Sequence, residues 1–435
     1  MFGQKLNHSL VGSPIDRRRV GVDFVGPILE GAFHLASPGA DANFNVDSHL
    51  NQLGKSSPCV NSPDKVLYIG SMRKRILILC DKSPKTSFGR IALSILRATQ
   101  AEHDAEMVWL SCKKDFPDPL NLAGHSAWSP TRELGRMMFP WQLARILKKV
   151  RPDWVLLIRP ELGFLLPAIR KAAPNAKTTL MIHDTFAETL YPDSLKFKLI
   201  NRFWIHGADR VDGFLFNSHW TQAQAKTAFQ IHGPQTVCGC EIDPADFHPL
   251  CTTPEALKQK WQLDPGRKAV LQISLDEPRK NIRIFLLLAQ KFPHVQFIRI
   301  GVQSKWINEF IAERQIQNLQ HRHGLSLESL REFYNLADAL VFPSYLEGFG
   351  YPPLEALGCG TPVIASNTSA MKETLPGVAS LIDDPDDLDS WVVALESLLS
   401  QGKLLSTLTP ERLDYFGPAS FAGRIQKHLN DLLPD

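Results

Sequence analysis

Two carboxylates and a glycine-rich segment stand together in the stretch LEGFGYPPLEALGCGTPVIAS, residues 346–366. Glu347 and Glu355 have seven residues between them, and the segment GFG, 348–350, follows Glu347 directly. Glycines after a strand let the backbone approach a ligand closely, and a helix N-terminus beyond them favours an anion such as phosphate. Carboxylates repel phosphate and suit neutral hydroxyl groups better. The pattern therefore predicts a nucleotide-sugar site in which the two carboxylates bind sugar hydroxyls and the glycines lie against the diphosphate.

For Glu355 a purely structural interpretation is also adequate. Pro353 suits the first position of a helix, which would place Glu355 in the first turn. A carboxylate there stabilises the helix by about 0.3–1 kcal/mol without any ligand. Glu347 precedes the glycines and has no comparable structural role, so the chemical interpretation depends mainly on Glu347.

Positive charge for a diphosphate is available in the loop LDEPRKN, residues 275–281. Arg279 and Lys280 come shortly after the apolar segment KAVLQIS, 268–274, which is predicted to be a strand. The alternative is a solvated surface pair. The position of these residues after the carboxyl end of a sheet strand favours ligand binding, because ligands of parallel sheets collect there.

The elements that must hold these residues alternate between short apolar strands and helices, in two series. The first series includes RKRILILC (73–80), WVLLI (154–158) and TTLMIHD (178–184), and the second runs from KAVLQIS (268–274) to TPVIAS (361–366). Such alternation predicts parallel sheets covered by helices on both faces. A helix is predicted to begin at Pro140, in FPWQLARILKKV.

The domain organisation follows from where this alternation is interrupted. Residues before Met72 show no clear period, and the stretch 240–265 is rich in prolines and acidic residues, which is typical of a junction. The predicted class is α/β with two Rossmann-like domains. The predicted ranges are an irregular extension over 1–72, domains over 73–245 and 246–420, and a C-terminal helix over 421–435.

Composition excludes several functional classes. The chain has 48 Lys and Arg against 45 Asp and Glu, so nucleic acid is not an expected partner. Seven cysteines without paired CxxC spacing indicate a reducing compartment and no zinc site. No apolar run approaches the roughly 18 residues that a membrane span needs. We expect a soluble cytoplasmic protein and leave peripheral membrane contact open.

Taken together, these residues resemble the retaining glycosyltransferases of family 4, group 1 enzymes with the two-domain GT-B fold. The resemblance is carried by EGFGYPPLE with the continuation ALGCGTPVIAS, the preceding LADALVFPS, the loop EPRKN and the stretch HGLSLESL. It is dense over 268–385, weaker over 73–250, and does not reach the first 70 residues.

The resemblance implies a role for each residue of this set. Lys280 and Arg279 would hold the donor diphosphate, Glu355 the ribose and Glu347 the hydroxyls of the transferred sugar, with the GFG backbone along the phosphates. Glu347, His183 and Lys280 are the predicted catalytic residues. The predicted donor-binding residues are Ser274, Arg279, Lys280, Glu347, Gly348, Phe349, Gly350, Tyr351, Leu354 and Glu355.

In the first domain, His183-Asp184 is similar to the His-Asp pair that the family has near the sugar and the acceptor. A lone histidine at a strand end is more often structural, but the paired domain architecture favours a functional role for His183. Gly89, where many family members carry two glycines, and Asp184 are assigned to the acceptor side. Glu241 and Ser274 depart from the family pattern: Glu241 stands where glycine is usual, and Ser274 where arginine or threonine is frequent.

The resemblance implies transfer of a hexose, of mannose or glucose type, from a nucleoside diphosphate sugar to an acceptor hydroxyl with retention. The expected acceptor is a glycan or a lipid-linked glycan of polysaccharide or glycoconjugate synthesis. No metal and no cofactor besides the donor are expected, and the acidic run IDDPDDLD, 382–389, is interpreted as a loop and helix N-cap. As in the family, the domains would close over the donor in the cleft between them, and the final helix would cross back toward the first domain.

Three other functions remain as alternatives. A sugar-nucleotide epimerase or a glycan phosphorylase with a lysine-bound pyridoxal cofactor would use the same fold. A non-catalytic nucleotide-sugar-binding subunit would keep the fold without turnover. A dehydrogenase is disfavoured, because no G-x-G-x-x-G follows the first strand of either domain.

Overall fold

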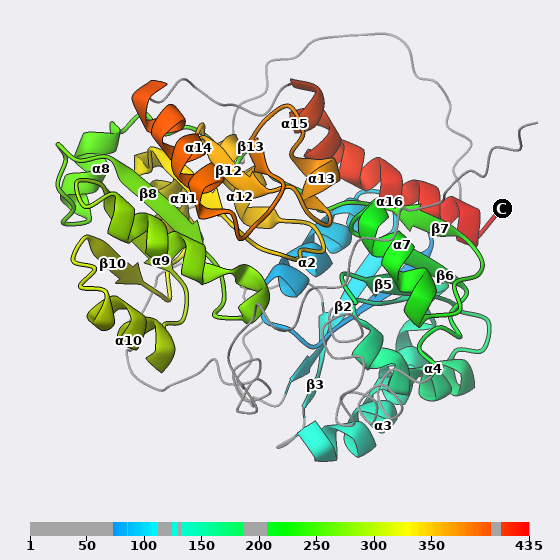
Figure 1. Cartoon of the computed structure of the whole chain (residues 1–435). Coiled ribbons are helices and arrows are strands. Elements are labelled where there is room, and N and C mark those ends of the chain that lie inside the picture. The colour runs from blue at the N-terminus through cyan, green and yellow to red at the C-terminus, as the bar shows by residue number, and fades with distance from the viewer. Residues whose placement is uncertain are drawn as a thin grey trace, which may run out of the picture. The chain divides into compact units, whose positions relative to one another are not determined.

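Two parallel sheets follow one another along the chain, each flanked by helices (Figure 1). The computed structural model describes residues 73–84, 86–111, 124–128, 132–185, 207–401 and 410–434. The predicted class, α/β with two Rossmann-like sheets, is confirmed. The extension expected over 1–72 lies outside the described residues, and the domain boundaries stay predictions. In the described part of the chain, no helix is long and apolar enough to cross a bilayer.

The first sheet has seven strands in the order β3-β2-β1-β4-β5-β6-β7, all paired in parallel. The strand order reverses between β1 and β4, and open α/β sheets bind ligands at such a switch point. The strands are β1 (Arg75–Cys80), β2 (Asp104–Ser111), β3 (Gly124–Trp128), β4 (Trp154–Leu157), β5 (Lys177–Ile182), β6 (Gly213–Phe216) and β7 (Gln235–Val237).

The helices beside this sheet are α2 (Ser87–Gln100), α3 (Arg132–Val150), the 3-10 helix η1 (Pro160–Leu165), α4 (Leu166–Ala172) and α7 (His219–Ala228). Thr86 caps α2 by accepting a hydrogen bond from the backbone N–H of Gly89 at 3.2 Å. The start of α3 predicted at Pro140 is wrong, because the helix begins at Arg132 and passes through this proline. Pro140 has no N–H, so α3 lacks one backbone hydrogen bond at that turn.

The second sheet has six parallel strands in the order β10-β9-β8-β11-β12-β13. They are β8 (Ala269–Ile273), β9 (Gln296–Ile300), β10 (Leu319–Arg322), β11 (Ala339–Phe342), β12 (Val363–Ser366) and β13 (Ser380–Ile382). Its helices are α8 (Pro254–Lys260), η3 (Pro278–Lys280), α9 (Ile282–Lys291), α10 (Lys305–Glu313), α11 (Leu327–Leu336), α12 (Tyr351–Gly358), α13 (Met371–Thr374) and α14 (Leu388–Gln401).

The chain ends in α15 (Pro410–Phe416) and α16 (Pro418–Leu432), and α16 packs against α2 and β7 of the first sheet (Figure 1). His428 of α16 is fully buried there, with one ring nitrogen 3.1 Å from the hydroxyl of Thr179 and the other 3.1 Å from the hydroxyl of Thr236. One apolar core includes Ile78 of β1 and Ile298 of β9 together with Phe421 of α16. This core joins the two sheets.

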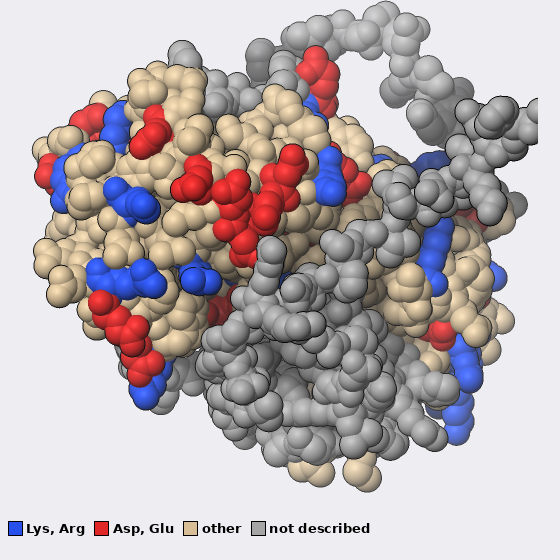
Figure 2. Space-filling model, viewed as in Figure 1, with Lys and Arg blue, Asp and Glu red and all other residues tan. Residues whose placement is uncertain are grey.

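The acidic run at 382–389 begins at the last residue of β13 and ends in the first turn of α14, and its interpretation as a loop and helix N-cap is confirmed. The Asp387 carboxylate accepts a hydrogen bond from the Ser390 backbone N–H at 3.4 Å and from its hydroxyl at 2.5 Å. In the space-filling view, acidic side chains gather over the second sheet while basic ones are scattered (Figure 2). Among the described residues, no group of three His, Cys, Asp or Glu is placed to hold a metal ion.

Candidate active site

Glu347 lies on the loop that follows β11, between two cations of the 3-10 helix η3, which comes after β8. The Lys280 ammonium donates to its Oε1 at 2.6 Å, and the Arg279 guanidinium donates to its Oε2 at 3.2 Å. Arg279 also donates to the carbonyl of Leu346 at 2.9 Å, and the N–H of Glu347 donates to the Ser369 hydroxyl at 2.8 Å. The structure therefore brings together three predicted residues that are 67 and 68 positions apart.

This cluster is buried, and its charges determine the protonation of each member. Burial alone raises the pKa of Glu347, but the adjacent Lys280 and Arg279 outweigh burial and hold that pKa below its usual range. Burial, assisted by Arg279, lowers the pKa of Lys280 against the opposing effect of Glu347. Glu277 also pairs with Arg279, at 2.7 Å. The four charges balance without a ligand, which makes the burial of two cations tolerable.

The helix α12 begins earlier than the sequence predicts. We expected Pro353 at its first position and Glu355 in its first turn, but α12 begins at Tyr351 and no acidic residue lies in its first turn. Gly350 adopts a left-handed conformation, φ +92°, which lets the helix start directly after the glycines. Pro352 and Pro353 cost no hydrogen bond there, because N–H groups of the first turn have no intrahelical partner.

Glu355 faces the first sheet, and both of its carboxylate oxygens have protein partners. Arg90 of α2 donates to Oε1 at 2.6 Å, and the Tyr334 hydroxyl donates to Oε2 at 2.6 Å. The Glu355 side chain is only 2% exposed. The Arg90 guanidinium also lies over the ring of Tyr351, 4.7 Å from its centroid. The ribose contact of Glu355 stays a prediction, since each carboxylate oxygen can accept a further hydrogen bond.

His183 lies at the carboxyl end of β5, against the glycines that follow Glu347. A Cβ added at Gly348 would lie 1.9 Å from the carbonyl oxygen of His183. The same carbonyl accepts hydrogen bonds from Asn217 at 2.8 Å and Thr221 at 3.3 Å, and Thr221 also donates to the carbonyl of Gly348 at 3.3 Å. Only glycine allows the two backbone segments to approach this closely.

The ring of His183 is neutral and has a defined tautomer. Burial lowers its pKa to about 4. Its Nε2 lies 2.9 Å from the carbonyl oxygen of Ile158, which can only accept, so Nε2 carries the proton. The ring of Phe88 packs edge-on against it, with centroids 4.7 Å apart. Nδ1 is left as a hydrogen-bond acceptor, as contact with a sugar hydroxyl would require.

The other predicted residues have more structural surroundings. Ser274 accepts a hydrogen bond from Gln272 at 2.6 Å, and Leu354 is fully buried, so only its backbone is suited to a ligand. Gly89 lies within α2, where a Cβ would come 2.1 Å from the carbonyl of Ser83. This close packing by itself accounts for a glycine at position 89, and the acceptor-side role of Gly89 stays a prediction. Asp184 follows His183. Burial lowers the pKa of Arg279, but Glu347, Glu277 and Asp184 outweigh burial and raise that pKa.

Sequence reasoning missed two cations near these residues. Arg90 follows the predicted Gly89 directly, yet no local pattern indicates its partner Glu355, which is 265 residues away. Arg159 is nearly buried after β4, with Asp81 at 3.4 Å and Glu161 as ion-pair partners. Charged residues directly after the apolar runs 76–80 and 154–158 were the available signal for Arg159.

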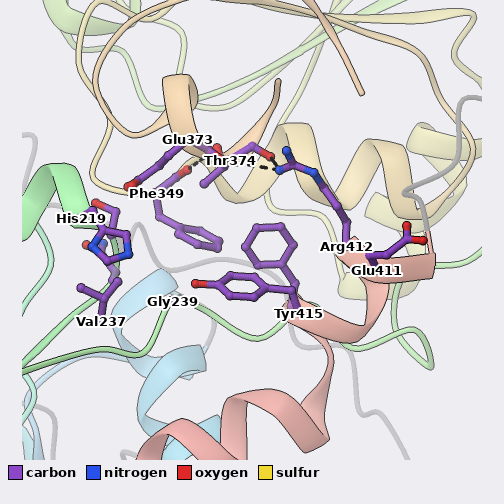
Figure 3. A pocket seen from close by; sticks show the side chains of 12 residues that line it. His219, Val237, Gly239, Phe349, Glu373, Thr374, Glu411, Arg412 and Tyr415 are labelled. Carbon is purple, nitrogen blue, oxygen red and sulfur yellow. Dashed lines mark hydrogen bonds between the residues drawn. The ribbon is translucent and has the colours of Figure 1, made fainter. Parts of the chain in front are cut away.

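A cavity of about 270 Å³ lies behind the glycine segment (Figure 3). Its wall includes the ring of Phe349 and the aromatic rings of Tyr415 and Phe416 from α15. Arg412 ties α15 to the second sheet by donating to the carbonyls of Thr374 and, at 2.8 Å, Pro376. Of the predicted donor-binding residues, only Phe349 lines this cavity. The full lining is Asn217, Ser218, His219, Val237, Gly239, Phe349, Glu373, Thr374, Glu411, Arg412, Tyr415 and Phe416.

Solved structures with a similar fold include sucrose-phosphate synthase from Thermosynechococcus elongatus, with a TM-score of 0.70 and 16% identity over 83% of this chain and 99% of that chain. HepE of Anabaena, solved in complex with UDP and glucose, has a TM-score of 0.70 and 14% identity over 82% of this chain and all of that chain. At these identities the likeness shows the fold alone.

Similar sequences include O-antigen chain mannosyltransferase B of Escherichia coli, 26% identical over 71% of this chain and 86% of that protein. O-antigen chain mannosyltransferase RfbU of Salmonella typhimurium is 42% identical over 51% of this chain and 60% of that protein. Family models match residues 89–246, as Glycosyltransferase Family 4, and residues 254–412, as Glycosyl transferases group 1. The two matches together span most of the described fold, and the chain belongs to the group 1 glycosyltransferases with the GT-B fold.

Proposed function

We propose that this glycosyltransferase moves a hexose, of mannose or glucose type, from a nucleoside diphosphate sugar to a hydroxyl of a glycan or lipid-linked glycan, with retention. The observation that carries the proposal is the buried cluster of Lys280, Arg279 and Glu347 beside the His183 backbone. Within the hexose class, the mannosyltransferase relatives support mannose.

Departure of the nucleoside diphosphate is the step that Lys280 and Arg279 would assist. Negative charge develops on the leaving diphosphate, and cations fixed in a buried site stabilise it without reorganising. The Lys280 ammonium has three N–H donors, of which Glu347 takes one. The remaining donors and the N–H groups of the glycine segment would hold the phosphate oxygens. We propose that this arrangement replaces a divalent metal ion.

Glu347 is better suited to hold the sugar than to attack it. Both of its oxygens are bonded to cations, at 2.6 and 3.2 Å, which lowers their nucleophilicity. Its free lone pairs can accept hydrogen bonds from sugar hydroxyls, and neutral His183 can accept one through Nδ1. These two acceptors would orient the hexose while its bond to the diphosphate breaks.

The experiment that tests the proposal begins with thermal stabilisation by UDP, GDP, ADP and their sugars, each with and without EDTA. A nucleotide at about 100 times its dissociation constant should stabilise the protein by about 2.7 kcal/mol. The best donor is then used for transfer to a glycan acceptor, and NMR of the product reports the anomeric configuration. Stabilisation by none of them would refute donor binding, strong loss of activity with EDTA would refute metal independence, and an inverted product would refute retention.

Variants separate catalysis from binding. Glu347→Ala and Lys280→Ala should abolish transfer, and Lys280→Ala should also weaken stabilisation by the nucleotide. If the wild type and both variants are equally inert while nucleotide still stabilises the protein, the chain is a binding subunit instead. Interconversion of the donor sugar without transfer would indicate an epimerase. Absorbance of a pyridoxal chromophore would indicate a phosphorylase.

A further inference from the structure

The helix α3 has a stripe of exposed apolar side chains along one face. Leu134, Met137 and Trp141 are 45, 77 and 58% exposed. Residues three and four positions apart in a helix stand next to one another, so these three form one continuous strip. The helix does not need this strip for its own packing, because its opposite face is the buried one.

That opposite face anchors α3 to the first sheet. Phe139, Leu143 and Leu147 are buried in the core that contains β1, β4 and β5 side chains. In Figure 1, α3 lies at the lower edge of the first sheet beside α4, and the two helices pack together. A rigidly held helix with an apolar outer face is suited to docking.

The exposed strip continues as a basic one toward the end of α3. Arg145 and Lys148 follow Trp141 at helical spacing and are exposed, with exposed Lys149 beside them. The Arg145 guanidinium lies 3.5 Å from the centroid of the Trp141 ring and so orients it. We call Leu134, Met137, Trp141, Arg145 and Lys148 the α3 stripe.

The charge of α3 is mostly positive. Its sequence carries one acidic residue, Glu133, against five basic ones, Arg132, Arg136, Arg145, Lys148 and Lys149. The adjacent α4 adds exposed Arg170 and Lys171 in its last turn. A surface that combines an apolar strip with several cations matches a partner that offers hydrocarbon and negative charge together.

Other exposed apolar residues in the described ranges show no such pattern. Leu327, Val393 and Tyr415 stand on three different helices, and Leu275 and Val302 lie in the loops that follow β8 and β9. Grouping on one helix face distinguishes the α3 stripe, since contiguous exposed apolar surface marks interaction sites.

We infer that the α3 stripe docks on the surface of an anionic lipid membrane. The helix would lie in the plane of the interface, with Leu134 and Met137 below the headgroups and the Trp141 ring among them. Arg145 and Lys148 would extend to lipid phosphates. The inference stands on this surface alone and holds whichever donor sugar the enzyme uses.

A second copy of the chain fits the α3 stripe less well. If two stripes paired antiparallel, the cations of one copy would be buried against the apolar half of the other. If they paired parallel, the cations would face one another. Both arrangements leave buried charge without a partner, which is costly.

The test uses the full chain and sedimentation with vesicles of phosphatidylcholine, with and without phosphatidylglycerol. The wild type should bind only the anionic vesicles, and less at high salt. The double variant Met137→Ser/Trp141→Ser should bind about tenfold more weakly, because the apolar strip is lost. Lys148→Gln/Lys149→Gln should lose about fivefold for each lysine. Val393→Ser and Lys291→Gln, on exposed sites of the second sheet's helices, should bind like the wild type.

Two further measurements complete the test. The melting temperature and nucleotide stabilisation of each variant should match the wild type, so that a change in vesicle binding reports the surface. Sedimentation velocity checks for a second copy. The inference is overturned if the wild type does not bind anionic vesicles, if the α3 variants bind as well as it does, or if Met137→Ser/Trp141→Ser converts a dimer to a monomer.

Discussion

Replacing Gly348 by alanine should disable the enzyme through the close approach of two backbone segments. The added Cβ would meet the His183 carbonyl oxygen at 1.9 Å and the Asn217 side-chain amide at 3.1 Å. Tolerated Cβ contacts begin at 3.0–3.4 Å, so one segment must move by about 1.1 to 1.5 Å. The carbonyl is held by Asn217 and Thr221, so we expect the Glu347 loop to move. A displacement of about 1 Å at a catalytic site can cost about 100-fold in rate.

The assay for Gly348→Ala measures kcat and KM for transfer from the best-stabilising donor, with urea unfolding in parallel. The overpacked position should also cost about 1–3 kcal/mol of stability. Gly423→Ala is the matched control, because a Cβ at Gly423 on α16 meets nothing within 4 Å. A folded Gly348→Ala protein whose kcat stays within about threefold of the wild type, against the roughly 100-fold loss expected, would refute the reasoning.

Three further predictions concern buried charge. Burial lowers the pKa of His183 and of His428 to about 4, below the unfolded value of 6.5, so the unfolded state binds more protons between these pH values. The free energy of unfolding should be highest above pH 6.5 and fall by up to about 3 kcal/mol per histidine toward pH 4. His428→Gln, which changes a residue outside the candidate active site, should make this pH dependence shallower in urea titrations. Arg90→Met should lower the free energy of unfolding in urea by about 3 kcal/mol, because it leaves the buried carboxylate of Glu355 with one partner fewer. Lys305→Met, which breaks an exposed ion pair, should change it by less than about 1 kcal/mol, and equal effects would contradict the prediction. Lys280→Met should lower stability by a similar 3 kcal/mol and weaken nucleotide stabilisation in a thermal shift assay, and unchanged nucleotide binding would contradict its assignment to the diphosphate.

Much of the fold could be predicted from local pattern. Strands such as 154–157 and 339–342 are short apolar runs flanked by polar residues, and each is a buried strand in the structure. Helix boundaries were less predictable. Pro140 and Pro353 were both expected to start helices, but Pro140 lies in the interior of α3 and Pro353 is the third residue of α12. A proline costs no hydrogen bond in the first turn, as in α12, whereas in α3 the surrounding packing must compensate for the hydrogen bond that Pro140 removes.

The part of the candidate site whose residues all follow strands of the second sheet could be predicted from the sequence. Arg279, Lys280 and Glu347 follow neighbouring strands, β8 and β11, which pair in parallel, so their loops meet at the same edge. Arg90 could not be found in this way. Its partner Glu355 belongs to the other sheet, and nothing in the spacing of either segment indicates that they meet.

The sequence by itself determined which residues stand at the carboxyl ends of the strands, because apolar periodicity defines the strands and parallel pairing aligns their ends. Only the tertiary structure decided what faces those residues across the two sheets. It set Gly348 against the His183 carbonyl and Arg90 against Glu355, and it made the outer face of α3 exposed while its inner face is buried. Such contacts depend on how whole elements pack, and local sequence patterns encode each element's faces without encoding which neighbour will cover them.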